Sequence, residues 1–450
     1  MIHKFYLNGL YIVLDVNSGS VLTVDKMTYD VLDYYHTDDT ETIVKKLKDQ
    51  YSEEDIRETI GELDELVAQE MLYTERDYDP DVYKNHDVIK ALCLHVSHDC
   101  NLKCNYCFAS QGDFNGEKCL MPLEVGKKAF DFITEASKDR YNIEVDFFGG
   151  EPLMNLDVVK ELVAYGHELE KKHHKRFNFT MTTNGVLLND DNIDWLNENM
   201  DNVVLSLDGR KEVNDRMRRT INDKGSYDLI IDDIKKMSAL REENGKDYYV
   251  RGTFTKYNKD FSNDVDFFAK QGFGSISIEP VVTEETQPYA LLEEDLPEIL
   301  AEYDKLALDY LDRKNRGYDY RFFHFNIDLG DGPCIYKRLS GCGAGRDYIA
   351  VTPNGDIYPC HQFVGDEKFI MGNVYEGIKR PDIKEMFAKA NLLNKEECSQ
   401  CWCRFICGGG CHANAYNFNH TVMKPYHLAC EMERRRVENA IMIGVIEGTL

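Results

Sequence analysis

The chain has 450 residues, 43% hydrophobic and 30% charged, and its 80 acidic against 53 basic residues give a formal net charge of −27. This length predicts two to four domains with apolar cores and excludes a disordered or low-complexity protein. The acidic balance argues against a general nucleic-acid or anionic-membrane binder, because phosphate groups would repel the average surface.

The 14 cysteines need an explanation. The first residues lack the basic region, apolar core and cleavage site of a signal peptide, and nowhere do eighteen apolar residues run together. We therefore expect a cytoplasmic protein without a membrane segment, in which thiols stay reduced. In that setting, clustered cysteines hold metal more often than they form disulfides.

Residues 1–78 predict a small domain of three strands followed by three helices. The strands are alternating, β-branched runs separated by Asn8-Gly9 and Asn17-Ser18-Gly19, which are hairpin signals. Helical periodicity then covers residues 28–35, 40–50 and 52–71. Residues 79–89 are polar and contain a proline, which is typical of a linker.

Residues 90–329 alternate short apolar strands with amphipathic helices. The predicted helices cover residues 122–137, 156–173, 189–199, 227–243, 261–271 and 294–314. Six strand-helix units in series imply an α/β fold with a parallel sheet, either an incomplete barrel or an open doubly wound sheet. In both cases the chemistry belongs at the carboxyl ends of the strands.

Residues 330–430 are rich in Gly, Cys and Pro, and nine of the 14 cysteines lie from Gly330 onward. Such a stretch shows little periodicity, so we predict irregular chain that metal sites cross-link. Residues 431–450 predict a terminal helix.

The first set of cysteines is Cys100, Cys104 and Cys107, directly after the first strand of the six-strand series. Three thiolates within eight residues can bind three corners of a cubane iron–sulfur cluster, whose fourth iron then has no protein ligand. The alternative for this motif is a three-cysteine zinc site.

These cysteines, with Tyr106 before the last one, resemble the signature of radical S-adenosylmethionine (radical SAM) enzymes. The resemblance implies that the open iron chelates S-adenosylmethionine and that its reductive cleavage gives a 5′-deoxyadenosyl radical. It also implies cofactor contacts at the ends of later strands. The expected cofactor-binding residues are Tyr106, Gly149, Gly150, Glu151, Pro152, Ser206 and Asp208. Taken alone, Gly149–Pro152 can be a turn, and Thr183-Asn184-Gly185 at the third strand's end can be helix capping.

The second set holds seven cysteines, too many for one four-coordinate ion, so it fits two zinc sites or nearly two clusters. Its spacing resembles the SPASM domain, which carries two auxiliary [4Fe-4S] clusters. The resemblance assigns Cys342, Cys360 and Cys411 to the first auxiliary site, and Cys398, Cys401, Cys407 and Cys430 to the second. Either Cys334 or a substrate thiolate would complete the first site. We expect Cys93, Cys119 and Cys403 to be core or incidental thiols.

His361 follows Cys360 directly, where SPASM enzymes that mature sulfatases have an aspartate base. The histidine puts sulfatase maturation in doubt. His361 is a candidate catalytic base for a thiol, or a structural hydrogen-bonding residue.

The first domain resembles the PqqD-like recognition element of enzymes that modify ribosomal peptides, a winged-helix-type module that binds a leader peptide as an added strand. The alternative is a structural cap on the barrel. The whole chain is most similar to maturases of six-cysteine (SCIFF) peptides. That resemblance implies a partial (β/α)6 TIM-like barrel between the recognition element and the Cys-rich SPASM domain.

It further implies thioether cross-links from cysteine sulfur to carbon in a Cys-rich precursor peptide. The cofactors would be S-adenosylmethionine and three [4Fe-4S] clusters, and the electron donor an external ferredoxin or flavodoxin. One rival is another radical modification, such as epimerisation, carbon–carbon bond formation or formylglycine synthesis. The other is a non-catalytic leader-binding scaffold with structural metal.

Overall fold

The structure is a computed structural model that describes residues 1–76, 78, 88–327 and 339–450. The predicted linker at 79–89 therefore lies outside the described residues apart from its last two, and so does Cys334. None of the helices in the described ranges has the length and apolar character needed to cross a membrane.

The N-terminal part forms an antiparallel sheet in the order β1-β2-β3, followed by three helices, as the sequence predicts. Asn8 and Gly9 have φ angles of 50° and 80°, which the tight turn between β1 and β2 requires. The winged-helix type of this domain stays a prediction. The elements are β1 (Ile2–Leu7), β2 (Leu10–Asp15), β3 (Val21–Val24), α1 (Lys26–Val31), α2 (Thr40–Leu47) and α3 (Glu53–Ala68).

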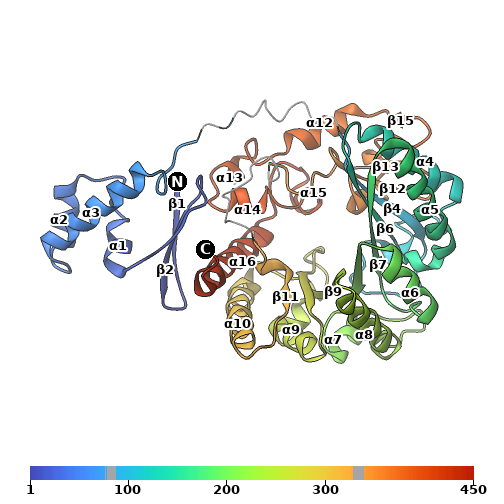
Figure 1. Cartoon of the computed structure of the whole chain (residues 1–450), viewed down its shortest axis with the longest axis horizontal. Coiled ribbons are helices and arrows are strands. Elements are labelled where there is room, and N and C mark those ends of the chain that lie inside the picture. The colour runs from blue at the N-terminus through green and yellow to red at the C-terminus, as the bar shows by residue number, and fades with distance from the viewer. Residues whose placement is uncertain (77, 79–87, 328–338) are drawn as a thin grey trace.

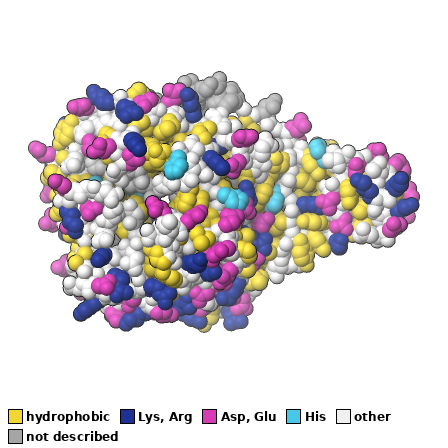
Figure 2. Space-filling model, turned by 180° about the vertical axis from the view of Figure 1, so that it is seen from behind, with side chains coloured by type: hydrophobic (Ala, Val, Ile, Leu, Met, Phe, Trp, Pro, Cys, Tyr) yellow, Lys and Arg dark blue, Asp and Glu magenta, His cyan; other side chains and the backbone are white. Residues whose placement is uncertain are grey.

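This small sheet has two buried faces, because successive side chains of a strand point to opposite sides. Val13 packs into a core formed with α1, α2 and α3, whereas Ile12 and Leu14 belong to the large core of the rest of the chain. The three helices lie at one end of the molecule, and Figure 2 shows this small unit projecting from the main body.

The second sheet runs in the order β11-β10-β9-β8-β7-β6-β4-β12-β13-β14-β15, and its first eight strands are parallel (Figure 1). The six predicted strands follow chain order without the reversal that defines a doubly wound sheet. Closure into a partial barrel stays a prediction. The strands are β4 (Ala91–His98), β6 (Asn142–Gly149), β7 (Arg176–Thr183), β8 (Asn202–Ser206), β9 (Asp247–Phe254), β10 (Ser275–Pro280) and β11 (Arg321–Phe322), with β5 (Cys119–Leu120) paired to the end of β4.

The predicted helices between these strands are confirmed, and two of them have the predicted bounds. Their apolar faces pack on the sheet, and the largest buried side chains are mostly phenylalanines such as Phe130, Phe147 and Phe179. The helices are α4 (Leu123–Ala136), α5 (Leu156–His173), α6 (Asp190–Asn199), α7 (Lys211–Met217), α8 (Tyr227–Glu243), α9 (Phe261–Lys270) and α10 (Leu296–Asn315).

The expectation of irregular chain over residues 330–430 is wrong for much of the described part, which contains strands and short helices. The strands are β12 (Tyr348–Val351), β13 (Asp356–Tyr358), β14 (Gly372–Asn373) and β15 (Gly377–Ile378). The helices are α12 (Pro381–Lys389), α13 (Glu396–Ser399), α14 (Arg404–Cys407), α15 (His412–Asn419) and α16 (His427–Glu447). Most of these elements are too short to show periodicity, and β12 forms by pairing in parallel with β4, a contact distant in sequence.

The predicted terminal helix at 431–450 begins earlier than expected, at His427. The candidate ligand Cys430 therefore lies in the first turns of α16, which packs against α10 and β1.

Candidate functional site

The loop after β4 carries Cys100, Cys104 and Cys107 at the carboxyl edge of the parallel sheet. Backbone hydrogen bonds fix this loop to the end of α7 and the chain just after it, from Asn105 N to Met217 O at 2.8 Å and from Lys103 N to Arg219 O at 2.6 Å. The thiols of Cys100 and Cys104 both interact electrostatically with Cys107. The structure thus gathers the three predicted cluster cysteines in one place.

Burial raises the pKa of Cys100 to about 12 and that of Cys104 to about 11. Both thiols are therefore protonated at neutral pH without metal, and binding iron would release their protons. Arg218 lies close to Cys104 and favours its thiolate.

Within the described ranges, no three His, Cys, Asp or Glu side chains gather tightly enough to hold a single metal ion. A zinc site needs its sulfurs around one centre, each about 2.3 Å from the metal. A cubane cluster spreads its thiolates over different irons and so needs wider spacing. Both the iron–sulfur cluster and the zinc site therefore stay predictions for this motif.

Gly149 and Gly150 bring the end of β6 against the cysteine loop. Gly149 has φ +133°, and a Cβ there would lie 2.1 Å from Ser97 O. A Cβ on Gly150 would lie 2.2 Å from Asp99 O, and its N–H donates to Ser97 O at 2.8 Å. Only glycine permits this approach.

Glu151 is fully buried, and protein donors occupy both of its carboxylate oxygens. Oε1 accepts from Leu153 N at 3.0 Å and from Thr183 Oγ1 at 2.8 Å, while Oε2 accepts from Asn184 N at 2.8 Å. Glu151 therefore ties the end of β6 to the end of β7, which gives Thr183 and Asn184 a positioning role. Pro152, predicted with it, begins a short 3-10 helix over Pro152–Asn155.

Tyr106, Asp208 and Arg218 form a buried polar group below the cysteine loop. The Tyr106 hydroxyl donates to the Asp208 carboxylate at 2.6 Å, and Arg218 Nη1 lies 3.2 Å from that hydroxyl and 3.9 Å from Asp208 Oδ1. Burial raises the pKa of Asp208 to about 6, although Arg218 opposes the shift. Arg218 Nε is buried without a partner in the described chain. Ser206, the other predicted contact, ends β8 and is half-buried.

The three cysteines assigned to the first auxiliary site come together from separate segments. Cys360 interacts electrostatically with both Cys342 and Cys411. Cys360 is buried before a 3-10 turn, whereas Cys342 and Cys411 are exposed residues. The described chain therefore presents three thiols here, and Cys334 lies outside it.

The four cysteines assigned to the second auxiliary site line one small cavity together with Cys403. Cys403 is buried in the hydrophobic core, as expected for a core thiol, and it also interacts with Cys401 and Cys407. The spacing gave no sign of this proximity because Cys403 reaches the cavity from the short turn before α14. The cavity's cysteines are Cys398, Cys401, Cys403, Cys407 and Cys430.

His361 lies between the first auxiliary site and the catalytic loop. Its Nδ1 is 3.0 Å from the Tyr348 hydroxyl, and its ring centroid is 5.6 Å from Phe108 and 5.1 Å from Phe148. Burial lowers the pKa of His361 to about 4. Cys93, predicted as a core thiol, is buried and forms a hydrogen bond with the same Tyr348 hydroxyl. Cys119 is half-buried in β5.

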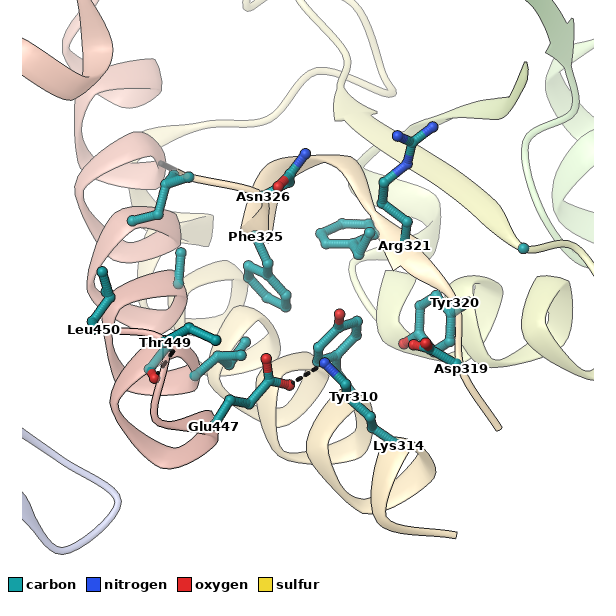
Figure 3. Close-up of a pocket in the computed structure, with 16 residues that line it drawn as sticks. Tyr310, Lys314, Asp319, Tyr320, Arg321, Phe325, Asn326, Glu447, Thr449 and Leu450 are labelled. Carbon is teal, nitrogen blue, oxygen red and sulfur yellow. Dashed lines mark hydrogen bonds and ion pairs between the residues drawn. The ribbon is translucent and has the colours of Figure 1, made fainter. Parts of the chain in front are cut away.

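A separate pocket of about 860 Å³ lies between α10, β11 and the end of α16, with no cysteine among its lining residues. Figure 3 shows Lys314 of α10 paired with Glu447 of α16 across it, at 2.7 Å. It lies at the amino end of β10, beside Gly274, and so away from the cysteine loop.

The family profile described as the Radical SAM superfamily matches residues 94–250, and that of the iron-sulfur cluster-binding SPASM domain matches residues 342–402. The chain carries a radical SAM domain followed by a SPASM domain. The first match covers the cysteine loop, β6, β7 and β8, and the second covers four of the seven cysteines assigned to the auxiliary sites.

Several known proteins resemble the chain over most of its length. The cysteine-type anaerobic sulfatase-maturating enzyme of Clostridium novyi (strain NT) is 28% identical over 344 residues, 71% of this chain and 86% of that protein. The solved structure of anSMEcpe with bound AdoMet has a TM-score of 0.64 at 20% identity, covering 80% of this chain and 100% of that chain.

Streptococcus suis SuiB bound to its precursor peptide SuiA has a TM-score of 0.54 at 18% identity, covering 95% of this chain and 98% of that chain. At these identities the two structural matches show a shared fold.

Proposed function

We propose that this radical SAM enzyme forms thioether cross-links between cysteine sulfurs and carbons of a Cys-rich precursor peptide. The proposal depends on one observation. The described first auxiliary site presents three thiols, and the adjoining His361 packs against Phe108, which directly follows the catalytic Cys107. A peptide thiol bound there would lie beside the carbon to be attacked.

The residues present fit the cofactors of such an enzyme. Cys100, Cys104 and Cys107 would hold the catalytic [4Fe-4S] cluster, and the assigned SPASM cysteines two more. The close approach of Gly149 and Gly150 leaves backbone groups at the loop for S-adenosylmethionine, with Tyr106, Ser206 and Asp208 nearby. When bound, the cofactor and cluster supply abstraction of a hydrogen atom. An external ferredoxin or flavodoxin would supply the electron for this.

The cross-link changes the peptide by two hydrogens. The acceptor carbon loses one hydrogen atom and the thiol loses one proton. As the S–C bond forms, the remaining electron would pass to the iron–sulfur clusters that the SPASM cysteines would hold. His361 directly follows Cys360 and is our candidate to accept the thiol proton; burial keeps its ring neutral but also lowers its pKa to about 4, which weakens it as a base.

The N-terminal domain is our candidate for binding the leader of the precursor peptide. In the described chain β3 pairs on one side only, with β2, so its other edge has free N–H and C=O groups. An extended leader can add there as a further strand. The SuiB structure with bound SuiA supports a peptide as the partner.

Formylglycine synthesis is the second candidate, because the Clostridium novyi relative is named a sulfatase-maturating enzyme. His361 in place of the expected aspartate base counts against it. The two reactions give different products: a thioether blocks the cysteine without creating a carbonyl, whereas formylglycine is an aldehyde that reacts with hydrazides.

The test is an anaerobic assay with the Cys-rich peptide encoded nearest to the gene. The purified protein should contain about twelve irons per chain and, with reductant and S-adenosylmethionine, release 5′-deoxyadenosine. Mass spectrometry should show a loss of two hydrogens per bridge. Zinc without iron, or no cofactor cleavage, would support the non-catalytic scaffold, and an unbridged peptide that reacts with hydrazides would support formylglycine.

A further inference from the structure

Lys395 is a buried lysine between the two auxiliary sites. The residue is 1% exposed, and its Nζ donates to Gly409 O at 2.8 Å. Gly409 is the middle of three glycines with φ angles of +74°, +95° and +71°, which carry the chain from Cys407 of the second site to Cys411 of the first. Lys395 thus anchors the loop that joins the two sites.

Cysteines surround the ammonium group. Burial lowers the pKa of Lys395, and Cys398, Cys407, Cys411 and Cys430 oppose this shift. Three of these belong to the second auxiliary site and one to the first. No carboxylate of the described residues lies within 4.0 Å of Nζ, whereas the partly buried Lys4 and Lys259 each pair with an aspartate. Lys175, the other buried lysine of the described chain, donates to two backbone carbonyls.

A buried ammonium without a counter-charge is unfavourable, and neutral thiols cannot compensate it. Cysteines that ligate iron do so as thiolates, so an occupied site is anionic. Cluster binding would convert the neighbouring thiols to thiolates, and these thiolates would supply the negative charge that Lys395 lacks.

We propose that Lys395 supplies the positive charge shared by the two auxiliary clusters, favouring their assembly and raising their reduction potentials. Reduction adds negative charge to a cluster, and a nearby cation stabilises the reduced state more than the oxidised one. Because it faces ligands of both sites, one substitution should shift both potentials. This inference rests on the auxiliary clusters of the proposed function and is independent of the peptide reaction.

A purely structural role is the alternative, in which Lys395 only holds Gly409 O. Lys395→Gln keeps a hydrogen-bond donor but removes the charge, and Lys395→Arg keeps both. Lys389→Gln is the matched control, because Lys389 is an exposed lysine of α12 in the same region, paired only with Glu385.

The variants are best compared in the full-length chain whose Cys100, Cys104 and Cys107 are replaced by Ala, so that only the auxiliary clusters remain. Iron per chain and redox titrations followed by electron paramagnetic resonance are the readouts. We expect Lys395→Gln to make reduction at least tenfold less favourable at both sites, a shift of about 59 mV to more negative potential for one electron. Lys395→Arg and Lys389→Gln should keep the iron content and the reduction potentials of the parent chain.

Loss of auxiliary iron in Lys395→Gln but not in Lys395→Arg would support the same conclusion through assembly. Full iron with unchanged potentials in Lys395→Gln would overturn the proposal, as would equal iron loss in both Lys395 variants. If the parent enzyme, with all its cysteines, cleaves the cofactor but modifies no peptide, the thioether proposal is refuted, and a shift of the auxiliary potentials in the triple-Ala chain would leave this one standing.

Discussion

The catalytic loop and the second auxiliary site hold their cysteines by different means. The first is one short segment whose backbone is hydrogen-bonded to the end of α7 and the chain just after it, and the cation beside it, Arg218, has Asp208 as a carboxylate partner. The second draws cysteines from a glycine-rich turn and from α16 around a cavity. Its buried cation, Lys395, has no carboxylate partner among the described residues, and the charges that act on it most strongly are those of four cysteines.

The difference shows how far each site can form without metal. The protein itself balances the charge at the cysteine loop after β4, through Asp208 beside Arg218. At the auxiliary site, both charge balance and cross-linking depend on the bound group. Loss of iron should therefore inactivate the first region but destabilise the second.

The largest expected effect comes from replacing Cys100, Cys104 and Cys107 with Ala. Cofactor cleavage should be abolished, because no thiolate remains to hold the catalytic cluster, while about two-thirds of the iron stays. Chromatography of 5′-deoxyadenosine and iron analysis measure this. Cys119→Ala, in the half-buried β5, should keep full cleavage, and cleavage by the triple variant would refute the assignment of the catalytic cluster.

Removing one ligand of the second auxiliary site tests the other side of the comparison. Cys430→Ala should lose about four irons and several degrees of melting temperature, since a cross-link between α16 and the glycine-rich turn disappears. Cys403→Ala is the control from the same cavity and should keep its iron. Equal iron loss in the two variants would mean that Cys403 is a ligand, and unchanged stability of Cys430→Ala would contradict the difference between the regions.

Asp146 on β6 gives the parallel sheet a pH dependence that needs no metal. Burial raises the pKa of Asp146 from 3.8 to about 6. Between these values the folded state binds more protons than the unfolded chain, so stability falls as the pH rises through this window. Asp146→Asn should raise the unfolding free energy at pH 7 by about 1–3 kcal/mol.

Denaturant unfolding at pH 4 and pH 7 measures this effect. The gain should be much smaller at pH 4, where the folded carboxyl is protonated and the unfolded one is only partly ionised. Asp139→Asn, at an exposed position before the same strand, should show no such dependence. An equal gain at both pH values would rule out titration of Asp146 as its cause.

The smallest effect concerns the contact between the N-terminal sheet and the second auxiliary site. The His3 ring stacks on Trp402 with centroids 3.7 Å apart, and Nε2 lies 2.9 Å from Glu438. His3→Ala should cost about 1 kcal/mol and speed amide hydrogen exchange in β1. His36→Ala removes a stack on Tyr73 within the N-terminal domain and should leave β1 protected.

The sequence predicted the sheet region well, because the hydrophobic periodicity of long amphipathic helices such as α5 and α8 identifies them. The cysteine groups followed from spacing and resemblance. The short elements of the SPASM region did not, since β12 exists through a partner more than 250 residues away. The sequence also could not predict the surroundings of Lys395 and Cys403 or the contact between His361 and Phe108. Each depends on segments that only the folded chain brings together.

The parallel pairing of β12 with β4 has a practical consequence for dividing this protein. The strand that leads into the catalytic loop is hydrogen-bonded to one that lies between Cys342 and Cys360, so the two sites share one ladder and cannot hinge apart. A truncated chain ending before residue 339 would leave the edge of β4 unpaired. An unpaired strand edge promotes aggregation. The two domains would have to be exchanged between enzymes as one unit.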